Sequence, residues 1–283
     1  METLNNIVLT IQDYMSNIVL IIALLGAGIW FSFRLKFIQV RGFKRGIKQV
    51  FGGLFGKKGE AGNDGMSSFQ ALATAIAAQV GTGNIAGAAT AIAIGGPGAI
   101  FWMWVAAFLG MSTIYAEALM AQKYKQIGDD GVVTGGPVYY IRAAFKGAFG
   151  KVLAGIFAVL LIFALGFMGN AVQSNSIAAS FRTAFGIPQW IMGLIVAVLS
   201  IAVFSGGMKR IAKVTETIVP LMAGLYIVGS LVVIICNWRN IPLAFYEIFV
   251  GAFAPSAIAG GAIGATIKLA LTKGVARGLF SNE

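Results

Sequence analysis

A run of amide, hydroxyl and glycine residues interrupts a long apolar stretch at residues 79–84, QVGTGN. Each glycine inside a helix costs about 1 kcal/mol relative to alanine, so two glycines two residues apart favour an opening of the helix. In lipid, non-helical backbone is tolerated only where it is buried in protein or lines a cavity. The pattern therefore predicts a broken membrane helix that holds a small polar ligand.

The chemistry of such a break follows from the backbone groups that it frees. The N–H groups at the start of the outer half-helix suit a carboxylate, and the carbonyls at the end of the inner half-helix suit a sodium ion. Thr82 and Asn84 can add side-chain oxygens. The alternative is that the glycines only form a close-packing face, which leaves Gln79 and Asn84 unexplained.

Further polar side chains occur in two later apolar stretches. Asn170 and Gln173 follow two glycines at helical spacing, and polar groups at this depth face a cavity or another helix. Either they face the substrate or they form interhelical hydrogen bonds. Glu117 lies near the inner end of the third stretch, where a structural pair with a basic loop residue is favoured over a proton site.

Composition bounds the class of protein. Of 283 residues, 58% are hydrophobic and 11% charged, about half the charge of a soluble domain. The chain has no histidine and one cysteine, Cys236, which excludes a histidine relay and an intrachain disulfide. No catalytic cluster indicates an enzyme or a cofactor. The net charge is +11, and the basic residues lie in short loops between the spans. Their placement indicates the orientation of the spans in the membrane and not nucleic-acid binding. We expect no removable signal peptide.

The apolar stretches predict an all-α integral membrane protein. The expected spans are 16–32, 68–94, 99–121, 152–175, 189–205, 216–236 and 243–267. An amphipathic segment at 1–15 precedes them, and a short helix near 138–141 lies along the inner surface. Placing the N-terminus outside puts 19 of the 21 Lys and Arg residues in inner loops, as the positive-inside rule requires. Aromatic residues 101–104 fit an interfacial belt, and Glu216 opens the sixth helix.

The seventh stretch is interrupted by Gly251, Pro255, Gly260, Gly261 and Gly264. It comes five spans after the first interrupted helix, which is the spacing that a five-helix repeat gives. Two interrupted segments in corresponding positions of two halves indicate a transporter site.

Three stretches carry a family resemblance. Residues 95–110, GGPGAIFWMWVAAFLG, closely resemble the defining motif of the alanine/glycine:cation symporters, also called sodium:alanine symporters. Residues 134–140, TGGPVYY, and 277–283, RGLFSNE, also look like that family. The resemblance implies a prokaryotic inner-membrane carrier that imports alanine or glycine with sodium. It also implies two inverted five-helix repeats, as in the bacterial leucine transporter, and we expect a monomeric transport unit.

The resemblance to the broken helix of the leucine transporter implies roles for single residues. Gly81 and Gly83 would offer backbone N–H groups to the substrate carboxylate. The carbonyls of Ala77 and Val80 would bind sodium. Asn84 would lie beside the substrate. Gln79 departs from the small residue of that pattern, so we assign it to the substrate.

The implied organisation has three parts. Residues 1–67 form an extra helix and a basic loop, 68–240 the first five-helix repeat, and 241–283 the start of a second repeat. Family members are longer, so the second repeat is only partly present, and this chain alone should not complete alternating access. The alternatives are a seven-helix receptor or light-driven pump, and a channel, which would need a repeated pore-lining element.

Overall fold

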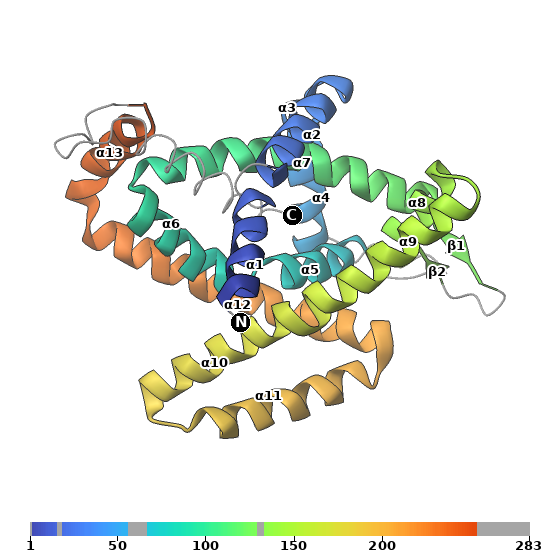
Figure 1. Ribbon diagram of the computed structural model, residues 1–283. Coiled ribbons are helices and arrows are strands. Elements are labelled where there is room, and N and C mark those ends of the chain that lie inside the picture. Colours follow the sequence, from blue (N-terminus) through green and yellow to red (C-terminus); the bar gives the residue numbers. More distant parts are fainter. Residues whose placement is uncertain (1, 16–18, 56–66, 129–132, 254–283) are drawn as a thin grey trace. The chain divides into compact units, whose positions relative to one another are not determined.

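The computed structural model describes residues 2–15, 19–55, 67–128 and 133–253 (Figure 1). Nearly all of these residues are helical, as the apolar periodicity predicts. The one exception is a small antiparallel pair of strands, β1 (Gln126–Ile127) and β2 (Val133–Thr134), in a loop for which the sequence predicts no strand. The described part of the chain is therefore all-α apart from this short hairpin.

The first helices are α1 (Glu2–Tyr14), α2 (Leu20–Arg34), α3 (Ile38–Arg41), α4 (Phe43–Phe55) and α5 (Ser68–Gln79). The π-helical turn η2 (Gly83–Gly87) leads into α6 (Ala88–Gly95) and α7 (Gly98–Lys123). Then follow α8 (Pro137–Ala144), α9 (Ala148–Leu161), the π-helix η3 (Ile162–Gly169) and α10 (Asn170–Phe185). The last are α11 (Gln189–Phe204), α12 (Gly207–Cys236), the short η4 (Trp238–Asn240) and α13 (Ile241–Phe253).

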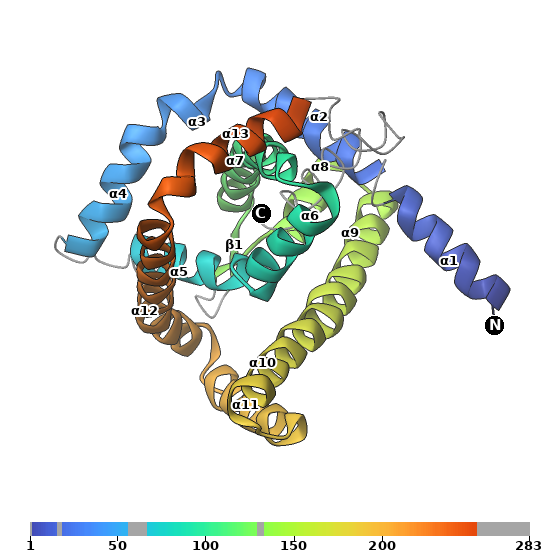
Figure 2. The ribbon, with the colours of Figure 1, turned by 90° about the vertical axis from the view of Figure 1, so that its left-hand side faces the viewer.

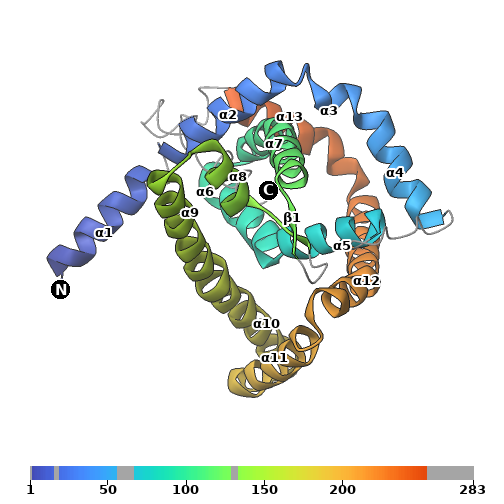
Figure 3. The same ribbon diagram turned by 90° about the vertical axis from the view of Figure 1, so that its right-hand side faces the viewer.

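Two compact units divide the chain, and each is described by itself. The first unit comprises residues 1–46, 83–116 and 222–283, and the second comprises 47–82 and 117–221. In the second unit α10 and α11 lie side by side, joined by a tight turn at Gly186, whose φ is +71° (Figure 3). In the first unit α2 is followed by a bend into α3 (Figure 2).

Three helical segments are long and apolar enough to cross a membrane: Gly98–Lys123, Ala148–Phe185 and Gly207–Cys236. Shorter apolar helices occupy Leu20–Arg34, Gly83–Gly95 and Gln189–Phe204. The positions of the first six predicted spans are thus confirmed as apolar helices, with two corrections of their ends. The fourth continues past residue 175 to Phe185, and the sixth begins at Gly207, nine residues before the predicted start. Glu216 therefore lies inside α12 and does not open it.

The seventh predicted span is described only in part. Its first residues lie in α13, which ends at Phe253. The predicted interruption at Pro255 and the glycines of 260–264 lies outside the described residues.

Small residues form the buried interior, and large apolar residues face outward. Ala99 and Ala252 are 0% exposed, whereas Leu165 and Ile201 are 64% and 68% exposed. Helices in lipid pack through small residues, because lipid chains solvate large apolar side chains as well as protein does. This distribution is what a membrane protein requires.

The contact between α2 and α7 in the first unit illustrates this packing. A Cβ on Gly28 would lie 2.8 Å from the Cβ of Leu109, so the helices approach closely there. Ser32 and Ser112 are buried beside it, 2% and 0% exposed. Both hydroxyls donate to the Gly28 carbonyl, at 2.7 and 2.9 Å. Small and hydroxylated residues hold the two helices together.

Candidate functional site at the helix break

A capping box starts the helix that leads to the break. The Ser67 hydroxyl accepts a hydrogen bond from Gln70 N (3.2 Å), and the Ser67 N–H donates to Gln70 Oε1 (3.1 Å). Reciprocal bonds of this kind satisfy two backbone donors at a helix start. The position of α5 is thus fixed by local chemistry at residue 67.

The other end of α5 is the predicted break. Val80 N–H donates to Ile76 O (2.8 Å), and Val80 itself is extended, with φ −92° and ψ 107°. The helix resumes as the π-helical turn η2, which leads into α6. The prediction that the helix opens at residues 79–84 is confirmed. The boundary between the two units also falls here, between Thr82 and Gly83.

Gln173 of α10 binds directly to the opened backbone. Its Oε1 accepts hydrogen bonds from Thr82 N (3.1 Å) and from Thr82 Oγ1 (2.9 Å). Both residues are partly buried and belong to the second unit. A side-chain carbonyl from another helix thus satisfies a backbone donor in the break, as buried polar groups require.

Gly81 lies against the same side chain. A Cβ on Gly81 would collide with the Gln173 amide nitrogen and lie 3.1 Å from its Oε1. A side chain at this position would displace the Gln173 carboxamide from its place beside Thr82. The sequence analysis named Gly81, Thr82 and Gln173 as site residues, and the structure brings these three together.

The base of α5 is fixed to α12 by polar contacts within the second unit. Gln70 Nε2 donates to Glu216 Oε2 (2.9 Å), and one turn further on the hydroxyls of Thr74 and Thr215 lie 3.1 Å apart. The sequence analysis missed Gln70, Thr74 and Thr215. The four-residue spacing of Gln70 and Thr74, two polar residues within an apolar stretch, is the signal that could have found this face of α5.

The remaining predicted residues of the break lie on either side of these contacts. Ala77 and Gln79 belong to the last turn of α5, where helix carbonyls lose their intrahelical partners. Gly83 and Asn84 begin the π-helical turn η2 in the first unit, and Asn84 is partly buried.

Asn170 is used within its own helix. Its Nδ2 donates to Gly166 O (3.0 Å), and the side chain is exposed. This bond is local to the helix, and contact of Asn170 with the substrate or with another helix stays a prediction.

Two π-helical segments accompany the predicted polar residues. One, η2, contains Gly83 and Asn84, and the other, η3, ends at Gly169 directly before Asn170. The π-helix is rare and occurs mostly as single-turn bulges at functional sites. The second segment leads directly into α10, which carries Asn170 and Gln173 three residues apart. Sequence periodicity alone contains no signal for these π-helical segments.

The GGPG and aromatic residues of 95–104 have a packing role. The predicted turn is confirmed, since α6 ends at Gly95 and α7 begins at Gly98, with Gly96 at φ +74°. A Cβ on Gly98 would strike the backbone of Gly251 in α13. The aromatic residues form a helix contact through the pairs Phe101–Phe253, Trp102–Phe253, Trp104–Phe245 and Trp104–Phe249, and the interfacial belt stays a prediction.

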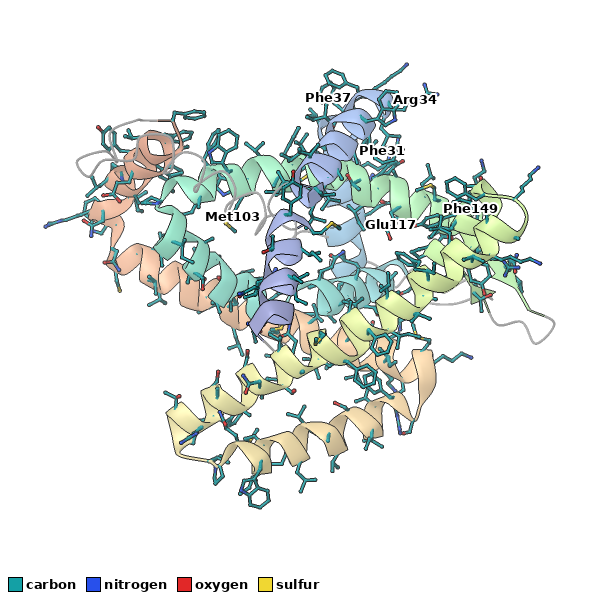
Figure 4. All side chains as sticks on the ribbon, in the orientation of Figure 1. Phe31, Arg34, Phe37, Met103, Glu117 and Phe149 are labelled. Atoms are coloured by element: carbon teal, nitrogen blue, oxygen red, sulfur yellow. The ribbon has the colours of Figure 1, made fainter. Side chains whose placement is uncertain are left out.

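Glu117 lies on the C-terminal part of α7 (Figure 4). Burial, and secondarily the nearby negative charge of Glu117, raises the pKa of the Tyr140 phenol on α8 above its usual value. A pair between Glu117 and a basic loop residue stays a prediction. Among the described residues no group of three His, Cys, Asp or Glu side chains could hold a metal ion.

The fold and the break define a helical membrane protein with an interrupted helix whose backbone is held by a side chain from another span. All 283 residues match the model of the sodium:alanine symporter family. The chain therefore belongs to the sodium:alanine symporter family, as the resemblance implied.

Relatives bear on the substrate question. The chain is 43% identical over 279 residues to a sodium/alanine symporter of Methanococcus maripaludis, covering 98% of this chain and 60% of that protein. It is 46% identical over 260 residues to a putative sodium/proton-dependent alanine carrier of Bacillus subtilis, covering 92% and 51%. A probable sodium/glutamine symporter of Bacillus subtilis is 42% identical over 282 residues, covering 100% and 56%. The chain thus spans between 51% and 60% of the length of these relatives.

Proposed function

We propose that this chain supplies the first half of the substrate site of a secondary active symporter that imports alanine or glycine together with sodium. The observation that carries the proposal is the opened backbone at Gly81–Thr82, held by Gln173 from another helix. Family membership supports the transporter class, and two relatives named for alanine support the substrate. The relative named for glutamine is almost as similar, so identity alone does not choose the substrate.

The substrate carboxylate binds at the break. A carboxylate oxygen is an acceptor of the same kind as the Gln173 carbonyl oxygen, which already accepts from Thr82 N and Oγ1. The N–H groups of Gly81 and Gly83 flank that of Thr82 and receive the carboxylate. Glycine permits this close approach because it has no side chain to keep the ligand away. Gln173 then lies beside the bound substrate.

Sodium binds to backbone carbonyls. Ala77 lies in the last turn of α5 and Val80 is extended, so both carbonyls come from the end of a helix, where the dipole is negative. In broken-helix transporters such ends coordinate the coupling ion. We assign Gln79, Asn84 and, from α10, Asn170 to substrate contact.

The wider architecture is part of the same proposal. Residues 68–240 form the first of two inverted five-helix repeats, residues 241–283 begin the second, and residues 1–67 precede the core. The protein is a monomeric transport unit in a prokaryotic plasma or inner membrane. Its N-terminus lies outside, because 19 of the 21 basic residues then lie in inner loops. The receptor, pump and channel alternatives have no support from the family.

Binding of radiolabelled alanine to the purified protein tests the proposal, measured in sodium chloride and in choline chloride at equal ionic strength. We expect saturable alanine binding in sodium, competition by glycine, and loss of binding in choline. Binding that is indifferent to sodium, or competition by glutamine but not by glycine, would contradict the assignment of ion or substrate respectively.

A further inference from the structure

The chain bends sharply where α2 ends. Leu35 and Lys36 close the last turn of α2, and Phe37 N–H donates to Ser32 O (2.7 Å). Lys36 and Phe37 both have φ of +52°, in the left-handed region that few L-residues adopt. The short helix α3 and then α4 follow directly after this bend (Figure 2).

After the bend a polar side chain is buried, and large apolar side chains are exposed. Gln39 is 8% exposed, and its Nε2 donates to Ser32 Oγ (2.6 Å) and to Phe108 O (3.3 Å), which holds the polar side of α3 against α2 and α7. Val40 and Phe43, by contrast, are 65% and 66% exposed. A segment that buries its amide and exposes its large apolar residues is suited to lipid and not to water.

Basic residues accompany the exposed apolar ones. Figure 4 shows Arg34 and Phe37 together at the end of α2. The sequence from 34 to 49 contains no Asp or Glu. Its basic residues, all exposed, are Arg34, Lys36, Arg41, Lys44, Arg45 and Lys48.

The two kinds of residue separate onto different faces of α4. At about 100° per residue, apolar positions 43 and 47 lie about 40° apart on one side of the helix. Lys44, Lys48 and Arg45 lie about 60°, 100° and 160° around the helix from Ile47, and Gln49 lies about 160° from Ile47 in the other direction. This is the pattern of a helix that lies in a membrane interface.

We infer that residues 33–49 form an interfacial surface that binds anionic phospholipid headgroups of the leaflet into which α2 runs. Two features favour anionic phospholipid as the binding partner of this surface. The surface is uniformly positive, which complements an anionic leaflet, and it begins at the last residue of an apolar helix, so the bilayer is the nearest partner. Four to eight basic residues directly beside a membrane helix favour anionic lipid in this way. The inference does not depend on the proposed transport activity.

Single-cysteine labelling tests where the apolar face lies. In the Cys236→Ala background, the matched variants Ile47→Cys and Gln49→Cys carry an environment-sensitive fluorophore, and the full chain is reconstituted in nanodiscs with 30% phosphatidylglycerol in phosphatidylcholine. We expect the label at 47 to emit at shorter wavelength and to be quenched severalfold more by lipid-borne nitroxide than the label at 49. Equal emission and quenching at the two positions would overturn the interfacial placement.

Charge removal tests the choice of lipid. The triple variant Lys44→Gln/Arg45→Gln/Lys48→Gln is compared with Arg142→Gln/Lys146→Gln/Lys151→Gln, which removes the same charge from α8, α9 and the residues between them. Selectivity for spin-labelled phosphatidylglycerol over phosphatidylcholine should fall by about fivefold for each charge removed in the first triple variant. High salt should have the same effect on the wild type. An equal fall in both triple variants, or no fall in the first, would show that residues 33–49 are not an anionic-lipid surface.

Discussion

Two glycines of this chain, Gly81 and Gly98, meet opposite kinds of neighbour. Gly81 lies against the carboxamide of Gln173, whose oxygen is hydrogen-bonded to Thr82. Gly98 lies against the backbone of Gly251, in a contact lined by aromatic rings. The first glycine makes room for a polar side chain, and the second lets two helices approach. The role of a glycine in a membrane helix therefore depends on the group that lies against it. From the sequence alone, both roles were possible for the glycines of residues 81–87.

The largest effect is expected for Gly98→Leu. Its side chain must enter the space of the Gly251 backbone, which cannot rotate away as a side chain can. Overpacking costs about 1–3 kcal/mol even where side chains can adjust. We expect loss of monodisperse protein, measured by size-exclusion chromatography and thermal unfolding in detergent. Gly155→Leu, at a glycine with open space around it, is the control and should behave as wild type. Wild-type unfolding of Gly98→Leu would refute the contact between α7 and α13.

Gly81→Leu should give the opposite phenotype. The side chain displaces Gln173 and fills the break, so alanine binding is abolished while membrane insertion and helix content are retained. Gly83→Leu should behave likewise. Gly224→Leu, on an open face of α12, is the matched control. Normal affinity in both Gly81→Leu and Gly83→Leu would exclude capture of the carboxylate by the backbone.

Two substitutions at Gln173 separate support of the break from contact with the substrate. Gln173→Leu removes the acceptor of two hydrogen bonds and should cost about 1–3 kcal/mol of stability. Gln173→Glu keeps an acceptor for Thr82 but places a negative charge beside the substrate carboxylate. It should preserve thermal stability and lower alanine affinity by at least about tenfold, the equivalent of about 1.4 kcal/mol. Equal affinity in Gln173→Glu and wild type would assign Gln173 a structural role alone.

Gln70→Ala should have a smaller effect that is confined to stability. It removes one half of the capping box and the hydrogen bond to Glu216. We expect a loss of about 2 kcal/mol, measured by denaturant unfolding. Thr74→Val, which removes one hydroxyl contact to Thr215, should cost about 1 kcal/mol. A larger cost for Thr74→Val than for Gln70→Ala would contradict this ranking.

The smallest effect concerns Tyr140 at alkaline pH. Burial, and then the charge of Glu117, raises the pKa of its phenol in the folded state. The neutral phenol is therefore favoured by folding, so its contribution is present below pH 10 and is lost as pH rises through the raised pKa. Ultraviolet titration should show one tyrosine ionising later than the others, absent in Tyr140→Phe. Glu117→Gln should lower that pKa only slightly, because burial is the larger cause.

Much of this molecule follows from its sequence. The apolar stretches locate the helices, and the glycines with Gln79 and Asn84 locate the break. The helix ends at Phe185 and Gly207 were missed because polar residues such as Asn175 and Lys209 continue a helix beyond the apolar part. The π-helical segments η2 and η3 were not predicted, because no residue type specifies a π-turn.

The partners of the site residues could be predicted only in part. Gln173 was predicted as a site residue because a polar amide costs free energy inside an apolar span and therefore faces a cavity or another helix. Its hydrogen bond to Thr82, 91 residues away, depends on the packing of α10 against the end of α5. The spacing of residues along the sequence does not predict that packing. Gln39 was missed because the sequence near it predicts a basic loop, where a polar side chain carries no signal.

Capture of the carboxylate by the opened backbone is the central claim, and a change in the ligand tests it most directly. Equilibrium binding of L-alanine and of L-alaninamide, which lacks the carboxylate, is compared in sodium chloride. We expect L-alanine to bind and L-alaninamide to bind at least about tenfold more weakly, a difference of about 1.4 kcal/mol or more. Equal affinity for the two ligands would contradict the account of the break at Gly81–Thr82.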